Sequence, residues 1–133
     1  MSDLLGDSPY ALDFAQHWAE ALNRHDVDSM LDFYADKAAL VPWDGQEWLR
    51  GDDQIRAYFE QLFEYPNLTC DLVGTEVNQN LGEGIRAISG GFDVSYGTEL
   101  SDMIRLKMRY TFVVEGGMSN WQIHTHHWSY AYP

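Results

Sequence analysis

The spacing of apolar residues predicts a helix near the start of the chain, over residues 9–23. Its apolar side chains recur three or four positions apart, which places them on one face of a helix. They are Leu12, Ala15, Trp18, Ala19 and Leu22. Asp7 or Ser8 is the expected N-cap, because a short polar side chain can accept hydrogen bonds from first-turn amides. We expect this helix to pack its apolar stripe inward.

Two further helices and a short strand are predicted before the middle of the chain. Asp26 is the expected N-cap of a short helix that ends near Ala35. Residues 51–63 keep a helical apolar period, and Asp52 is the expected cap of this third helix. Between these two helices, residues 38–43 are a short apolar run that contains a proline, which favours an edge strand.

From Asn67 onward the pattern changes to that of strands. Runs rich in β-branched and aromatic residues are separated by glycine and asparagine turn signals. The predicted strands are 68–77, 85–96, 102–114 and 121–130. Helices that precede a run of strands are typical of the α+β class, in which three helices cover one face of a mostly antiparallel sheet. From a length of 133 residues we expect a single domain, over residues 1–133.

The composition of the chain limits the partners and the cellular compartment that we expect. The chain has 8 basic and 21 acidic residues, a net charge of −13, which repels nucleic acid and anionic membranes. Its single cysteine, Cys70, excludes a disulfide within the chain, and the first residues lack the pattern of a signal peptide. We therefore expect a cytoplasmic protein. The sequence contains no phosphate-binding loop or dinucleotide fingerprint, so we expect no cofactor.

Four segments resemble the nuclear transport factor 2-like (SnoaL-like) superfamily, and they follow in its order. Residues 33–38 with Leu40 are similar to its turn from the second helix into the first strand, and residues 50–59 are similar to the entry to its third helix. Residues 109–113 and 121–129 resemble the last hairpin of one branch. That branch includes the calcium/calmodulin-dependent protein kinase II association domain and small stand-alone bacterial relatives.

This resemblance implies a cone: a curved sheet wraps around a long helix and leaves an interior cavity with an open mouth. It also implies a homodimer through the outer face of the sheet. Members of the superfamily include ketosteroid isomerases, scytalone dehydratase, polyketide cyclases and the kinase hub domain. The fold therefore leaves the function open, and the argument depends on the residues of the site.

The last predicted strand concentrates histidines. Strict alternation would place His124, His126 and Trp128 on one face and His127 on the other, unless a bulge intervenes. By the resemblance, His127 matches the family's most regular histidine. His126 or His127 is a candidate for general acid–base catalysis, and a structural or dimer-seam role is the alternative for each. His124 and His126 also have ligand spacing, but a third metal ligand is missing, so we predict no metal site.

Three other polar residues are candidates for chemistry. Tyr34 at a cavity wall could polarise a carbonyl group. Asp93 is a candidate base, because desolvation would raise its pKa; an outward position or a pair with Arg109 is the alternative. Arg109 lies in the middle of a predicted strand, where a guanidinium needs a carboxylate partner or an anionic ligand.

Aromatic residues are the expected lining of the cavity, because such sites are mostly apolar with a few polar groups. The candidates for ligand binding are Trp18, Trp43, Tyr58, Phe92 and Trp128. Core packing is the alternative for Trp18 and Phe92. Trp128, Tyr130 and Tyr132 are predicted to be partly buried between two subunits, because the sheet carries more aromatics than a monomer would expose.

Two classes of function follow from these features. The first is a cavity protein of the SnoaL-like type that binds a small apolar or aromatic ligand. In this class the protein could be a non-redox enzyme, such as an isomerase, cyclase or dehydratase acting on an aromatic or polyketide-like molecule. The alternative is an oligomerisation module that resembles the kinase hub domain and has no catalytic activity.

Overall fold

The computed structural model describes residues 9–43, 47–116 and 120–130. The helices are α2 (Pro9–Asn23), α3 (Val27–Leu31) and α4 (Gly51–Leu62), with a short 3-10 helix η1 (Leu100–Asp102). The strands are β1 (Tyr34–Val41), β2 (Leu49–Arg50), β3 (Thr69–Gly82), β4 (Ile85–Tyr96), β5 (Ile104–Glu115) and β6 (Gln122–Tyr130). They form one sheet in the order β2-β1-β6-β5-β4-β3, and only the β1–β6 pair is parallel. The α+β prediction is therefore confirmed.

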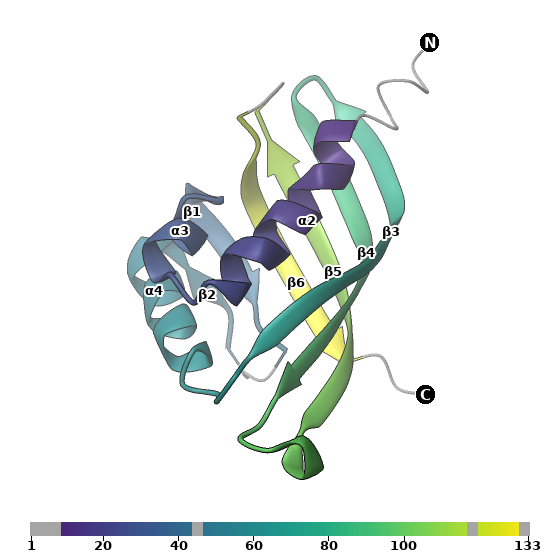
Figure 1. Ribbon diagram of the computed structural model, residues 1–133. Helices are drawn as coiled ribbons and strands as arrows, with labels where there is room; N and C mark the ends of the chain where they lie inside the picture. Colours follow the sequence, from purple (N-terminus) through teal and green to yellow (C-terminus); the bar gives the residue numbers. More distant parts are fainter. Residues whose placement is uncertain (1–8, 44–46, 117–119, 131–133) are drawn as a thin grey trace.

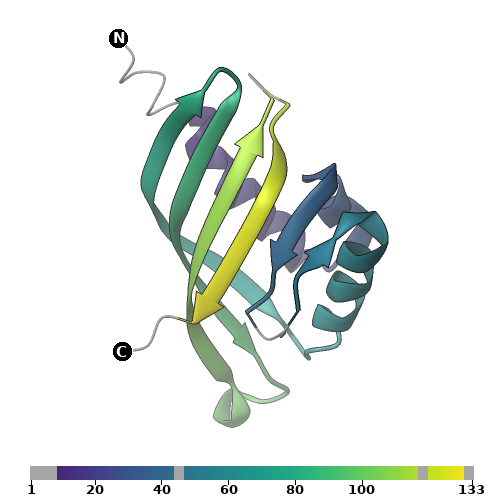
Figure 2. The same cartoon turned by 180° about the vertical axis from the view of Figure 1, so that it is seen from behind.

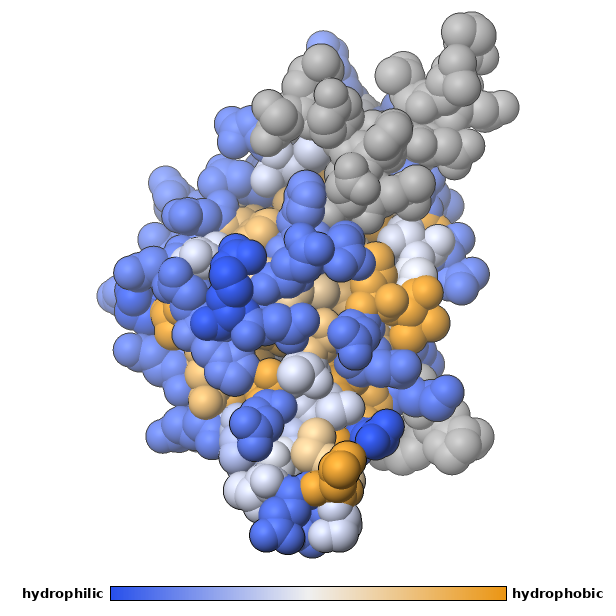
Figure 3. Space-filling view, in the orientation of Figure 1, coloured by the Kyte–Doolittle hydropathy of each residue, from blue (hydrophilic) through white to orange (hydrophobic). Residues whose placement is uncertain are grey.

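The helices lie on one side of the curved sheet. Figure 1 shows α2 crossing the inner face of the long strands, while α3 and α4 gather beside β1 and β2. Polar side chains cover most of this helical side in the space-filling view of Figure 3. Seen from behind in Figure 2, the long strands carry no helix in the described part of the chain. The sheet thus has a covered inner face and an open outer face.

The predicted apolar stripe of α2, from Ala15 onward, packs on the inner face of the sheet. Trp18 and Leu22 are fully buried, and the Trp18 ring stacks on Phe92 of β4 at 5.2 Å and packs against Phe112 of β5 at 5.5 Å. Burial of such large aromatic side chains supplies most of the packing energy of a small core. The helix ends at Asn23, as predicted. Its predicted caps, Asp7 and Ser8, lie outside the described residues.

Two boundaries differ from the prediction. The Asp26 side chain caps α3 as expected, but α3 ends at Leu31 and the chain already enters β1 at Tyr34. The cause is a long-range pairing, because the Ile123 amide of β6 donates to the Phe33 carbonyl at 2.6 Å. Pro42 follows β1, which lies between β2 and β6, so the predicted edge position was wrong.

The start of α4 also differs from the prediction. Its N-cap is Arg50 rather than Asp52, which lies in the first turn. The Arg50 amide donates to Gln54 Oε1 at 2.8 Å, so a side chain from inside the helix accepts the hydrogen bond of the N-cap amide. Gly51 has a φ of +79°, a left-handed conformation that glycine adopts without strain. Asp52 still lies at the positive end of the helix dipole, where a carboxylate is favourable.

A bulge in β6 decides which histidine faces the core. Val113 of β5 pairs with Thr125, but the next residue, Val114, pairs with Ile123, so His124 has no partner in this register. Strict alternation therefore fails at this point, and both Ile123 and His126 are fully buried. Bulges of this kind re-aim the side chains that follow them.

Replacing Gly90 with alanine is expected to lower the free energy of unfolding by about 1–3 kcal/mol, as overpacking does. A Cβ atom at Gly90 would overlap the carbonyl oxygen of Gly74 on the adjacent strand β3. Gly91→Ala is the matched control, because its nearest contact would be the Met108 carbonyl oxygen at 3.4 Å. Urea unfolding of both variants measures the difference. Equal stability of the two variants would contradict the close approach at Gly90.

Candidate functional site

A chain of three buried polar side chains crosses the core from α2 to β6. Trp18 Nε1 donates to the Tyr34 hydroxyl at 3.2 Å, and the same hydroxyl lies 2.9 Å from His126 Nδ1. The Tyr34 oxygen accepts the indole hydrogen, and the direction of its bond with Nδ1 depends on the His126 tautomer, because a hydroxyl can both donate and accept. This arrangement fixes the orientation of the imidazole.

Burial controls the ionisation of Tyr34 and His126. Burial lowers the pKa of His126 well below its usual value of 6.5, and the nearby His127 lowers it further. Burial also raises the pKa of the Tyr34 phenol, against the smaller opposite effect of the hydrogen bond from Trp18. Both groups are therefore neutral at physiological pH. His126 Nε2 is buried and finds no hydrogen-bond partner among the described residues.

A second buried hydrogen bond connects this core to a surface pocket. Trp128 of β6 packs edge-on against Trp18 at 5.4 Å, and its Nε1 donates to the Tyr58 hydroxyl of α4 at 3.2 Å. Tyr58 is 8% exposed and its ring lines the pocket. Trp128 thus positions Tyr58, and the pocket wall is continuous with the aromatic core.

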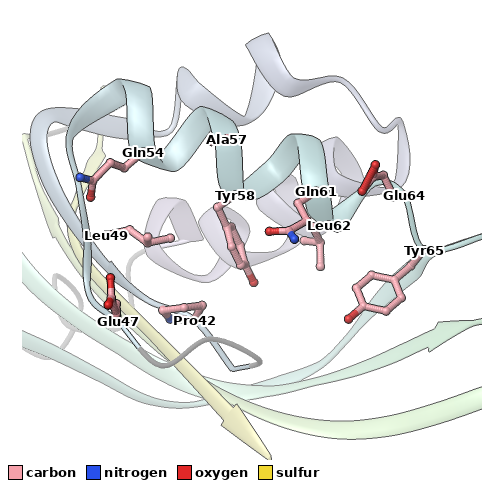
Figure 4. Close-up of a pocket in the computed structure, with 10 residues that line it drawn as sticks. All are labelled: Pro42, Glu47, Leu49, Gln54, Ala57, Tyr58, Gln61, Leu62, Glu64 and Tyr65. Carbon is pink, nitrogen blue, oxygen red and sulfur yellow. The ribbon is translucent and has the colours of Figure 1, made fainter.

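The pocket lies between α4 and the ends of β1 and β2, with a volume of about 700 Å³. Figure 4 shows Tyr58 pointing down from α4 toward the strands, with Leu49, Gln61 and Leu62 beside it. The lining residues are Pro42, Glu47, Leu49, Gln54, Ala57, Tyr58, Gln61, Leu62, Glu64 and Tyr65. Most of the wall is apolar or aromatic, and a few polar groups interrupt it.

Aromatic rings continue beyond one end of the pocket. Tyr65 packs on Tyr96 with a centroid distance of 4.5 Å and lies 6.3 Å from Trp43. Trp43 also contacts Tyr130 edge-on at 5.7 Å. These four rings come from segments that are far apart in sequence, and together they brace the wall that Tyr65 forms.

The structure divides the predicted site residues into three groups. Tyr34, His126, Trp18, Phe92 and Trp128 are buried together in the core. Tyr58 lines the pocket, and Trp43 is half-buried next to Tyr65. His127, Asp93 and Arg109 are exposed on the outer face of the sheet, opposite the core. The two catalytic histidine candidates therefore lie on opposite faces of β6.

The outer-face residues do not form the predicted pair. Asp93 lies opposite Lys107 in the β4–β5 register, and Arg109 lies opposite Gly91. The Arg109 guanidinium donates to the Tyr130 carbonyl oxygen at 2.8 Å. Its exposure removes the premise of a buried guanidinium that needs an anionic partner. Trp128 is 1% exposed in a single chain, so the prediction that it lies between subunits was wrong; Tyr132 lies outside the described residues.

Most of the pocket residues were missed by the sequence analysis. Leu49 lies on the two-residue strand β2, which is too short to give a periodic signal. The helix α4 carries Gln54, Ala57 and Gln61 on the same side as Tyr58, and their helical spacing was the available signal. Whether these residues line a pocket depends on the elements that α4 packs against, and the spacing of apolar residues along the sequence does not specify those elements.

Metal ligation and membrane insertion find no support in the described ranges. No group of three or more histidine, cysteine, aspartate or glutamate side chains is placed to hold a metal ion there. The bulge separates His124, which is exposed, from the buried His126. Within the same ranges, no helix is both long enough and apolar enough to cross a membrane.

Fold and site together define a nuclear transport factor 2-like protein, a class in which a curved sheet and its helices form a cone. The family model of the SnoaL-like domain matches residues 12–133. The chain belongs to this SnoaL-like family. None of the curated proteins matches it.

Solved structures share the fold at low sequence identity. A candidate calcium/calmodulin-dependent protein kinase II association domain from Xanthomonas campestris is 24% identical, with a TM-score of 0.78 over 90% of this chain and 84% of that one. A ketosteroid isomerase-like protein from Erwinia carotovora is 14% identical, with a TM-score of 0.74 over 96% and 99%. A candidate dehydratase from Streptomyces avermitilis is 14% identical, with a TM-score of 0.75 over 90% and 93%. These similarities establish the fold alone.

Proposed function

We propose that the chain binds a small ligand with an aromatic or largely apolar body in the pocket beneath α4. The observation that carries this proposal is the pocket itself, about 700 Å³ in volume and lined by Tyr58, Tyr65 and Leu62 among others. Ligand sites have volumes of about 300–1,000 Å³ and mostly apolar walls with a few polar groups. The size and the lining of this pocket both agree with that class of site.

Binding is better supported than catalysis by the positions of the predicted catalytic residues. His126 and Tyr34 are buried in the core and are absent from the described lining, while His127 and Asp93 lie on the opposite face. In a cofactor-independent isomerisation or dehydration, Tyr58 would be the phenol that contacts the substrate, and Trp128 would act as its positioning residue. General acid–base catalysis needs a group within hydrogen-bond reach of the substrate, a position that neither buried group occupies.

A pocket-filling substitution tests the binding proposal. Ala57 lies on α4 at the pocket wall, so Ala57→Trp is expected to fill the space and abolish binding of phenethyl alcohol, a neutral aromatic probe. Glu60→Trp is the matched control, because Glu60 is exposed on the same helix and lies outside the lining. Saturation-transfer NMR measures binding to each variant. Equal binding to the wild type and to Ala57→Trp would contradict the proposal, as would the absence of binding to the wild type.

We also propose that two copies associate through the outer face of the sheet, as a second property of the same chain. This face carries no helix in the described part of the chain (Figure 2), and charged residues of both signs lie on it. Asp71 on β3 and Asp93 on β4 form an acidic pair, while Lys107 and Arg109 on β5 are basic. In a two-fold arrangement the acidic strands of one copy can face the basic strand of the other.

Thr111→Glu is expected to dissociate this dimer, because Thr111 lies at the centre of the outer face and its hydroxyl is 2.8 Å from that of Ser89. A buried carboxylate between two copies would be strongly unfavourable. Light scattering at micromolar concentration should give twice the mass of one chain for the wild type and a single mass for the variant. Thr98→Glu, in the exposed β4–β5 loop, is the control. A monomeric wild type would contradict the proposal.

A further inference from the structure

We propose that the ligand of the α4 pocket carries a positive charge, so that the substrate class is an aromatic amine or another organic cation with an apolar body. This inference rests on the proposed binding function and adds the charge of the ligand. It follows from the electrostatics of the pocket wall, from the direction of α4 and from the aromatic rings of the lining.

The described lining contains carboxylates and no basic side chain. Glu47 and Glu64 are the charged residues among the ten that line the pocket. Figure 4 shows Glu47 at one end and Glu64 beside Tyr65 at the other, with Tyr58 between them. A ligand that spans the pocket therefore has a carboxylate near each end. The net charge of the chain, −13, adds a negative field that favours cations over anions.

The orientation of α4 adds to this negative potential. The helix ends at Leu62. The pocket wall reaches this end, because its lining includes Gln61, Leu62 and Glu64. The last carbonyl groups of α4 accept hydrogen bonds from the amides of Phe63, Glu64 and Tyr65, and the aligned peptide dipoles of the helix place a partial negative charge at this end. No basic residue occupies that last turn. A ligand cation would therefore find the Glu64 carboxylate and the negative end of the helix dipole at the same end of the pocket.

The basic residues of this region are placed elsewhere. Arg56 on α4 forms an ion pair with Asp28 of α3, with Nη2 and Oδ1 2.9 Å apart, on the side of the helix that contacts α3. Arg50 is exposed at the start of α4 and is absent from the described lining. Neither guanidinium neutralises the two carboxylates within that lining.

Aromatic rings provide the second element of cation recognition. Tyr58 and Tyr65 both line the pocket, and phenol rings attract ammonium groups through their quadrupole. Leu49 and Leu62 supply apolar contacts for the body of the ligand. Carboxylates with aromatic rings favour a protonated or quaternary amine over an alcohol of the same size, and both disfavour a carboxylic acid.

Three probes of nearly equal size separate the charge from the shape of the ligand. Phenethylamine is a cation at neutral pH, phenethyl alcohol is neutral and phenylacetate is an anion. The proposal predicts that the wild type binds the amine most tightly and the acid most weakly. Glu47→Gln and Glu64→Gln should each weaken binding of the amine by about two- to fivefold, the usual effect of one exposed charge partner. Binding of the alcohol should change little.

A charge change outside the pocket is the control. Glu60→Gln removes the same charge from α4, but Glu60 is absent from the described lining, so it should leave the preference for the amine unchanged. Titrations followed by amide NMR give all the affinities. Equal affinity of the wild type for the amine and the alcohol would overturn the charge inference and leave the binding proposal intact. If none of the three probes binds, both proposals fail.

Discussion

Replacing Trp18 with alanine is expected to lower the free energy of unfolding by about 3–5 kcal/mol, the usual effect of deleting a large buried aromatic side chain. Trp18 is fully buried and packs against Phe92, Phe112 and Trp128. The substitution would leave a cavity at the point where α2 meets the sheet. It would also remove the donor to the Tyr34 hydroxyl. Urea denaturation with circular dichroism measures the loss.

The matched control uses the same substitution at the surface. Trp48 is 65% exposed, so Trp48→Ala should change the stability by no more than about 0.5 kcal/mol. If Trp18→Ala does not fold, Trp18→Phe keeps a ring in the same site and should show a smaller loss. Equal stability of Trp18→Ala and Trp48→Ala would contradict the central position of Trp18 in the core.

The wild type is expected to lose stability between pH 7 and pH 5 through His126, by at most about 2 kcal/mol, the limit that the unfolded pKa sets over this range. Burial holds its folded-state pKa well below the unfolded value of 6.5, so the unfolded chain binds the proton more readily. The stabilising contribution is complete above the unfolded pKa and decreases as the pH falls below it. The loss continues until the pH reaches the folded-state pKa.

Two glutamine substitutions isolate this contribution. His126→Gln removes the buried imidazole, so its free energy of unfolding should decrease less between pH 7 and pH 5 than that of the wild type. His127→Gln removes the exposed neighbour on the opposite face and should largely preserve the pH dependence, with a small change because His127 contributes to the low pKa of His126. Urea midpoints at several pH values measure the slopes. Parallel slopes in the wild type and His126→Gln would show that His126 is not buried in its neutral form.

The helices and the long strands were predictable because their burial follows a regular period. The apolar stripe that contains Trp18 and Leu22 defined α2, and the predicted bounds of β4, residues 85–96, agree with the structure. The family resemblance supplied the arrangement of these elements around a cone. A regular period is a local property of the chain, so it survives folding unchanged.

The site was harder to predict because it depends on register and on non-local packing. One bulge at His124 decides that His126 faces the core and that His127 faces outward. The pocket wall combines α4 with β2, and a strand as short as Leu49–Arg50 carries no periodic signal. The polar link from Trp128 to Tyr58 joins residues 70 positions apart, and only the folded chain reveals it.

The central claim is that the pocket beneath α4 binds a small organic molecule. An amide NMR titration of the wild type with phenethylamine tests it most directly, because the spectrum reports both affinity and location. We predict saturable shifts at Leu49, Ala57 and Leu62, which line the pocket, and no comparable shifts at Lys107 or Thr111 on the outer face. Shifts confined to the outer face, or no saturable shift at the pocket residues, would contradict the claim.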